Sequence, residues 1–127
     1  MSILKGLSIY SGLKDYTIDE NLKYIKLAKE IGIDFFFTSC HIDEAVLNED
    51  FFKILKYCKE INMQLVVDVN KNAYELIKEY NDFIVFRLDY GFSIDEIVWM
   101  SHNYDLIELN ASCMTKEYLN KLVNVLL

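Results

Sequence analysis

Three apolar stretches of the chain each contain polar residues spaced two positions apart. The pairs are Asp68 and Asn70 in VVDVN, Arg87 and Asp89 in FRLDYGF, and Glu108 and Asn110 in IELNAS. Residues two apart on a β-strand point to the same side of it. A charged side chain inside such a run is unfavourable by several kcal/mol unless it is paired or hydrated. The three pairs therefore predict one shared polar pocket at the ends of successive strands.

Two earlier stretches add polar candidates to this pocket. GLSIY ends in Tyr10, and FFFTSCH contains Ser39 and His41. In parallel α/β folds, ligands meet the carboxyl ends of the strands. The candidate binding residues are therefore Tyr10, Ser39, His41, Asn70, Arg87 and Asn110.

Simpler interpretations of the same residues stay open. Arg87 can form a structural ion pair with Asp89 or Glu108. Asp68 can cap the helix that follows its strand, and Asn70 is the better candidate for that role. In these interpretations the polar residues stabilise the fold and do no chemistry.

A metal site is a further alternative. His41, Asp68, Asp89 and Glu108 offer nitrogen and oxygen ligands of the kind that Mg²⁺ or Mn²⁺ binds. No local spacing in the sequence requires such a site. We therefore expect neither a metal nor a cofactor.

The elements that must position these residues follow a regular alternation. Five apolar runs, rich in Ile, Val, Leu or Phe, predict strands at residues 4–10, 34–40, 64–70, 82–90 and 105–112. Most are too continuous for strands with one wet face, which is typical of parallel strands covered on both faces. Helical patterns lie between and after them, at residues 17–32, 48–62, 72–81, 93–103 and 115–127. The alternation predicts an α/β fold with a parallel sheet and right-handed crossovers.

Several helix ends carry recognisable signals. Thr17 with Glu20, and Ser93 with Glu96, have the spacing of a capping box. Gly32 provides the left-handed residue that ends the first helix. These signals support the helix boundaries independently of the apolar pattern.

Five βα units can be arranged in two ways. They can form part of a (β/α)8 barrel, which typically has about 250 residues, or a complete open, doubly wound five-stranded sheet. The chain has 127 residues, no proline and no low-complexity segment. We therefore expect a single domain over residues 1–127. The predicted fold is a partial barrel of five βα units, with the open doubly wound sheet as the alternative.

The amino-acid composition limits the classes of partner that we expect. The chain is 53% hydrophobic and 26% charged, with a net charge of −7. Because Lys and Arg are not clustered, we do not expect nucleic acid as a partner. No apolar run reaches the roughly 18 residues of a membrane span, and the N-terminus lacks a signal-peptide core. Cys40, Cys58 and Cys113 have no metal-binding spacing and are expected to be packing residues, as in a cytoplasmic protein.

Taken in chain order, these motifs resemble the N-terminal barrel domain of the 6-phospho-N-acetylmuramidase family. The matching segments are GLSIY, FFFTSCH, VVDVN, FRLDYGF and IELNAS, which span nearly the whole chain. The most specific part is RLDYGF followed by IELNAS. The family pattern has a proline after the tyrosine of the first strand, where this chain has Ser11.

The resemblance implies a (β/α)8 barrel with a smaller C-terminal domain. It also implies a cytosolic glycoside hydrolase that cleaves 6-phospho-N-acetylmuramyl glycosides in peptidoglycan recycling, so the expected partner is a small phosphosugar. Its implied catalytic candidates are Asp68, Asp89 and Glu108.

Glycosidases pair a protonated carboxyl group with an ionised one. Asp89 and Glu108 would end neighbouring strands roughly 5 to 10 Å apart, which includes both retaining and inverting geometry. We expect Arg87 to lower the pKa of Asp89, which leaves Glu108 as the acid.

The length of the chain sets a limit on this activity. Five units leave three barrel units and the second domain of the family unaccounted for, and an open sheet exposes unpaired backbone at its edges. We expect a truncated or split product, a piece that needs a complementary C-terminal fragment or self-associates through the open edge, or a small protein that has re-closed as an open sheet. Independent catalysis is the least expected outcome.

The main competing hypothesis is a non-catalytic binding module of the flavodoxin or receiver type. Its length and element order fit, and VVDVN resembles the third strand of a receiver. A receiver also has an acidic pair after its first strand and a lysine after its fifth, where this chain has SIYSG and NASC. A flavin site needs a phosphate-binding loop after the first strand, and YSGLKDYT is a poor one.

Overall fold

The computed structural model describes residues 3–9, 17–40 and 49–127, with residues 39 and 40 described by their backbone alone. It contains one five-stranded sheet in which all neighbouring strands are parallel. The strands are β1 (Gly6–Ser8), β2 (Phe35–Cys40), β3 (Gln64–Val69), β4 (Ile84–Leu88) and β5 (Ile107–Leu109). The α/β class and the parallel sheet are confirmed.

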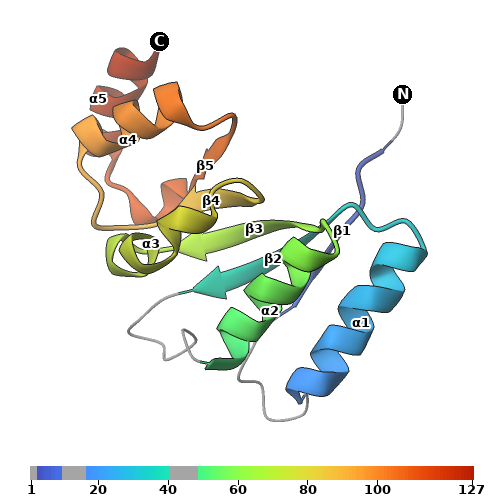
Figure 1. Ribbon diagram of the computed structural model, residues 1–127. Coiled ribbons are helices and arrows are strands. Elements are labelled where there is room, and N and C mark those ends of the chain that lie inside the picture. The colour runs from blue at the N-terminus through green and yellow to red at the C-terminus, as the bar shows by residue number, and fades with distance from the viewer. Residues whose placement is uncertain (1–2, 10–16, 41–48) are drawn as a thin grey trace.

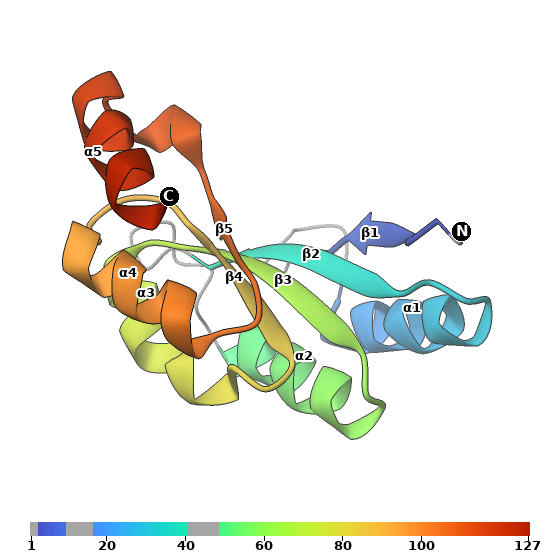
Figure 2. The same cartoon turned by 90° about the horizontal axis from the view of Figure 1, so that it is seen from above.

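Helices connect the strands in regular alternation (Figure 1). They are α1 (Ile18–Glu30), α2 (Glu49–Glu60), α3 (Lys71–Ile77), α4 (Ile94–Asn103) and α5 (Lys116–Leu126), with short 3-10 turns η2 (Lys78–Tyr80) and η3 (Ala111–Cys113). Seen from above, α1 to α4 lie along one side of the sheet, and α5 lies beyond β5 (Figure 2).

The strand order distinguishes the two arrangements that the sequence left open. The order is β1-β2-β3-β4-β5. A doubly wound sheet reverses its order at one point, as in the 2-1-3-4-5 order of flavodoxin-type and receiver folds. Without a reversal, every crossover passes the same side of the sheet, as in a barrel. The described sheet is open, and its winding is that of the partial barrel.

Alternation along the strands separates the two faces of the sheet. Leu65, Val67 and Val69 of β3 are fully buried, and Phe86 and Leu88 of β4 are at most 1% exposed. These residues belong to a core to which every helix contributes; the contributing residues include Ile25, Ile54, Ile77, Ile97 and Leu122. Burial of large apolar side chains contributes about 1.5–3 kcal/mol each, so this layer is the main source of stability.

Both predicted N-caps are present, but of the two predicted capping boxes only the one at α4 is complete. Glu20 N donates to Thr17 Oγ1 at 3.2 Å. At α4 the capping box is complete, because Glu96 N donates to Ser93 Oγ and Ser93 N donates to Glu96 Oε1, both at 3.1 Å. Gly32 follows α1 with a φ of +93°, in the left-handed region as expected.

The largest differences from the sequence predictions lie near the C-terminus. β5 is shorter than expected, because the chain turns at Ala111–Cys113 into η3. On α5, Leu122 is buried, whereas Val123 and Leu126 are 48% and 37% exposed. These two apolar residues lie on the last helix beyond β5, at an end of the sheet where the described residues supply no further unit.

The cysteines divide into two kinds. Cys58 is a packing residue as expected, and its burial raises the pKa of the thiol to about 12. Cys113 is exposed, so the packing prediction is wrong for this residue. The side chain of Cys40 lies outside the described part. Within the described segments, no helix is both long and apolar enough to cross a membrane.

Two glycines allow the turn geometry to be tested. Gly91 and Gly32 both have φ of +93°, but a Cβ at Gly91 would lie 2.9 Å from Lys71 Cβ, whereas nothing lies within 4 Å of one at Gly32. We predict that Gly32→Ala lowers the free energy of unfolding by about 1–2 kcal/mol through the backbone alone. Gly91→Ala should lower the free energy of unfolding by about 1–3 kcal/mol more than Gly32→Ala does, because the new Cβ crowds Lys71. Urea unfolding of the two variants measures both losses; equal losses would contradict the steric role of Lys71.

Candidate functional site

Four polar residues form one row across the carboxyl end of the sheet. In the strand register, Ser39 lies beside Asp68, Asp68 beside Arg87, and Arg87 beside Glu108. Neighbouring strands are about 4.8 Å apart, so the row is about 15 Å long. Because side chains at one register position project from the same face, Asp68, Arg87 and Glu108 share the face opposite the helix-covered core.

Arg87 lies at the centre of this row between two carboxylates. Its Nη1 is 3.5 Å from Asp68 Oδ1, and its guanidinium carbon is 6.0 Å from the ring centroid of Phe37. The side chain is 32% exposed. We expected Arg87 to act on Asp89, but its described ion pair is with Asp68, because the register puts Asp68 directly beside it.

Asp89 is held by a side chain from the neighbouring strand end. It is 2% exposed, and Asn110 Nδ2 donates to its Oδ1 at 2.6 Å. Asn110 also contacts the η3 turn, where Ser112 Oγ donates to its Oδ1 at 2.6 Å and its Nδ2 lies 3.3 Å from Cys113 Sγ. This network joins the carboxyl ends of β4 and β5.

Asn70 has a structural role at the start of α3. Its Oδ1 accepts from Ala73 N at 2.8 Å, and its Nδ2 donates to the Tyr90 hydroxyl at 3.3 Å. Asn70 is 2% exposed. These bonds favour the capping interpretation over direct contact with a substrate.

The structure describes no side chain for the remaining predicted residues. Tyr10 and His41 lie outside the described residues, and Ser39 is described by its backbone alone. Within residues 3–9, 17–40 and 49–127, no three His, Cys, Asp or Glu side chains are grouped so as to hold a metal ion. The metal alternative therefore gains no support from Asp68, Asp89 and Glu108.

A cavity of about 190 Å³ opens beside Asp89, between the segments that follow β4 and β5. Tyr118 at its border donates a hydrogen bond to the carbonyl of Phe92 at 2.8 Å, and burial raises the pKa of its phenol. The lining residues are Asp89, Tyr90, Gly91, Phe92, Cys113, Met114, Thr115 and Tyr118. Asp68 and Glu108 do not line this cavity. Of the three predicted carboxylates, Asp89 therefore lies at the cavity. Asp68 and Glu108 lie in the row of Ser39, Asp68, Arg87 and Glu108, called the register row below.

Sequence reasoning missed several residues around the site. Phe37 stacks against Arg87 and is two positions before Ser39, so the period of the strand could have placed it on the same face. Tyr118 and Cys113 had no such signal, because a helix start and a 3-10 turn bring them to the cavity. Their positions depend on how the segment after β5 folds back.

Comparison with known proteins is consistent with this arrangement. The family described as 6-phospho-N-acetylmuramidase, N-terminal, matches residues 5–126. The chain belongs to this family. The 6-phospho-N-acetylmuramidase resemblance that the motifs indicated is thereby confirmed. No curated protein matches the chain.

A solved structure supports the fold. It is the crystal structure of a conserved protein from a locus in Enterococcus faecalis with an unknown function, similar with a TM-score of 0.64 and 26% sequence identity. The similarity covers 96% of this chain and 36% of the other. The chain thus spans little more than a third of that relative's length.

The bond between Asn110 and Asp89 gives a prediction for stability. Asn110→Ala removes a donor from a buried carboxylate, which should cost about 1–3 kcal/mol of unfolding free energy. Asn120→Ala, at an exposed position of α5, is the matched control and should change stability by less than about 0.5 kcal/mol. Chemical denaturation of both variants measures the difference. A loss no larger than that of the control would show that the bond contributes little.

Proposed function

We propose that this chain forms the substrate-binding wall of a cytoplasmic glycosidase that cleaves 6-phospho-N-acetylmuramyl glycosides in peptidoglycan recycling. The family match over residues 5–126 supports the substrate class. The observation that supports the binding of an anionic sugar most directly is the register row, in which the Arg87 cation stands between Asp68 and Glu108 at the carboxyl ends of the strands. Sugar hydrolysis requires two carboxyl groups on either side of the glycosidic bond.

Glu108 is the proposed proton donor to the leaving oxygen. It is exposed on the open face of the sheet and therefore within reach of a sugar bound there. Asp89 is the proposed partner carboxylate, because the Asn110 amide donates a hydrogen bond to its Oδ1 and fixes its orientation. With the acid on one strand and the partner carboxylate at the end of the next, the glycosidic bond would lie across β4 and β5.

Arg87 is the proposed ligand of the sugar's anionic group. A guanidinium group has several N–H donors in a planar fork that matches phosphate or carboxylate oxygens. The 3.5 Å ion pair with Asp68 and the Phe37 ring hold the side chain while leaving it partly exposed. Asp68 is therefore proposed to orient Arg87 rather than to react.

Catalysis by this wall is proposed to require the further βα units that close a barrel, on this polypeptide or on another. β1 and β5 form the edges of the described sheet. The exposed Val123 and Leu126 of α5 offer apolar surface next to one of these edges. A complementary C-terminal segment would cover that surface and remove water from the face of the sheet, which strengthens electrostatic interactions with the substrate.

The assignment of Glu108 can be tested in a chimera. Residues 5–126 replace the matching segment of the solved Enterococcus faecalis protein, and release of N-acetylglucosamine from the disaccharide of 6-phospho-N-acetylmuramic acid and N-acetylglucosamine is measured, because a sugar leaving group needs to be protonated. We expect Glu108→Gln to lower kcat by about 10²–10⁴-fold, because the general acid is lost. Glu117→Gln, on exposed α5, should leave the rate unchanged. A Glu108→Gln chimera with the full rate would rule out this residue as the acid.

The assignment of Arg87 predicts a loss of discrimination. Inhibition of the same chimera is compared for N-acetylmuramic acid 6-phosphate and N-acetylmuramic acid. Arg87→Met should lower the affinity for the phosphorylated inhibitor about 10- to 100-fold, which corresponds to the loss of one hydrogen bond to a charged group. The affinity for the unphosphorylated inhibitor should fall much less. Lys53→Met on α2 is the control for loss of one positive charge. Equal weakening of both inhibitors would show that Arg87 does not bind the phosphate.

A further inference from the structure

The cavity beside Asp89, of about 190 Å³, is too small to hold a whole phosphosugar. Sites that enclose an entire small molecule usually measure about 300–1,000 Å³. A cavity below that range takes one substituent of a ligand whose ring lies outside it. Its position and its lining decide which substituent that is.

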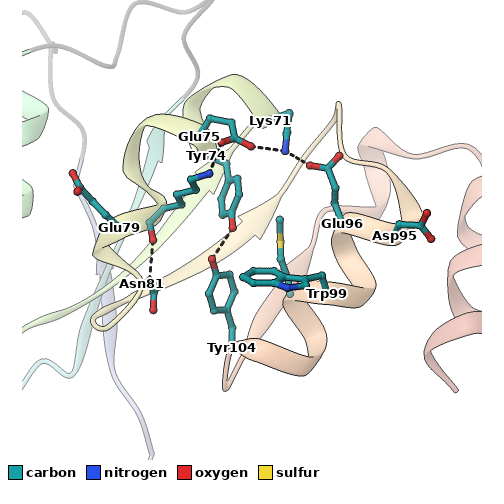
Figure 3. A pocket seen from close by; sticks show the side chains of 11 residues that line it. Lys71, Tyr74, Glu75, Glu79, Asn81, Asp95, Glu96, Trp99 and Tyr104 are labelled. Atoms are coloured by element: carbon teal, nitrogen blue, oxygen red, sulfur yellow. Dashed lines mark hydrogen bonds and ion pairs between the residues drawn. The ribbon is translucent and has the colours of Figure 1, made fainter.

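Fixed contacts hold the segment after β4, which forms one wall of this cavity. Lys71 N donates to the carbonyl of Tyr90 at 3.1 Å, and the Lys71 side chain forms an ion pair with Glu96 of α4 (Figure 3). Tyr118 of α5 also lines the cavity, and its hydroxyl donates to the carbonyl of Phe92 at 2.8 Å. Because these contacts tie the walls to each other and to α3 and α4, the cavity is formed before a ligand binds.

The lining of the cavity favours an uncharged group. Phe92 is buried, and Met114 packs against the core, so both present apolar surface. Among the residues that the structure describes, no Lys, Arg or His lines the cavity. An anionic group in this space would have no cation beside it, which is strongly unfavourable away from water.

Only one of the characteristic substituents of the proposed sugar fits this description. 6-Phospho-N-acetylmuramic acid carries an acetamido group on C2, a lactyl ether on C3 and a phosphate on C6. The lactyl and phosphate groups are anionic, whereas the acetamido group is uncharged. C2 is bonded directly to the anomeric carbon. A sugar whose anomeric carbon lies beside Asp89 therefore has its acetamido group next to the same residue.

We propose that the cavity beside Asp89 binds the N-acetyl group of the sugar. A carboxyl oxygen of Asp89 accepts the acetamido N–H, which a carboxylate can do while it keeps its bond from Asn110. Phe92 and Met114 contact the acetyl methyl group, and Cys113 borders it. The inference rests on the proposed function and adds to it the residues that select an N-acyl sugar.

Cys113 allows the position of the acetyl group to be tested by covalent labelling. Its thiol is exposed and lines the cavity, whereas burial raises the pKa of Cys58 to about 12 and makes that thiol unreactive. The full chain is incubated with the N-bromoacetyl analogue of N-acetylmuramic acid 6-phosphate, whose reactive carbon replaces the acetyl methyl. The Cys113 sulfur forms a bond to this carbon, bromide leaves, and the thiol proton passes to the buffer.

We expect the analogue to alkylate Cys113 at least about tenfold faster than bromoacetamide does at the same concentration, because the bound sugar holds the reactive carbon beside the thiol. An excess of N-acetylmuramic acid 6-phosphate should slow the reaction. Peptide mass spectrometry measures the rate at each cysteine. Equal rates with the two reagents, or faster labelling at Cys40, would overturn the proposal.

A displaced thiol is the matched control for this labelling. The double variant Cys113→Ser, Asn120→Cys moves the thiol to an exposed position of α5 that does not line the cavity. Both reagents should alkylate the new cysteine at the same rate. A preference for the sugar analogue at this position would show that the preference at Cys113 does not come from the cavity.

The size of the acyl group gives a second measurement, made by inhibition of the chimera described above. Met114→Ala enlarges the cavity and should raise the affinity for the N-butanoyl analogue, relative to N-acetylmuramic acid 6-phosphate, about 5- to 20-fold. Leu119→Ala, at a partly buried position outside the cavity, should leave this ratio unchanged. Circular dichroism establishes that both variants are folded. The same ratio in both variants would overturn the proposal.

The inhibition data separate this inference from the proposed function. If N-acetylmuramic acid 6-phosphate inhibits the chimera but Met114→Ala does not change the preference, the acetyl site alone is wrong. If N-acetylmuramic acid 6-phosphate does not inhibit the chimera at all, the proposed function is wrong and this inference falls with it.

Discussion

The constraint on which this structure depends is the direction of winding. Each strand lies beside its predecessor, and all five are parallel. Right-handed crossovers then return the chain on the same side every time. One face of the sheet is therefore covered by helices, and the carboxyl ends of all strands meet along one rim. Arg87 and the carboxylates come together for this reason, although they are far apart in sequence.

The sequence predicted the fold class and the faces of the strands well, because both depend on local period. Arg87 lies between Phe86 and Leu88 on β4, so the period of the strand alone places it on the side opposite these two apolar residues. The capping box of Ser93 and Glu96 is equally local. Such features are decided within a few residues, and they were confirmed.

The partner of Arg87 was beyond the reach of local reasoning. Pairing with Asp68 depends on the register between β3 and β4, and a shift of one residue would have turned Asp68 to the other face. The cavity beside Asp89 was hidden for a similar reason, because Tyr118 reaches it only after the η3 turn redirects the chain.

The carboxylate of Glu96 contacts the first residues of two helices, α3 and α4. Its Oε1 accepts the backbone N–H that begins α4, and its Oε2 pairs with Lys71 at the start of α3. Lys71 N in turn donates to the carbonyl of Tyr90 at 3.1 Å, in the turn after β4. The turn that follows Asp89 is thus held by a hydrogen bond from the start of α3 at Tyr90 and by the cap of α4 at Ser93. The rim of the sheet and the flank between α3 and α4 are therefore joined through the contacts of Glu96 and Lys71.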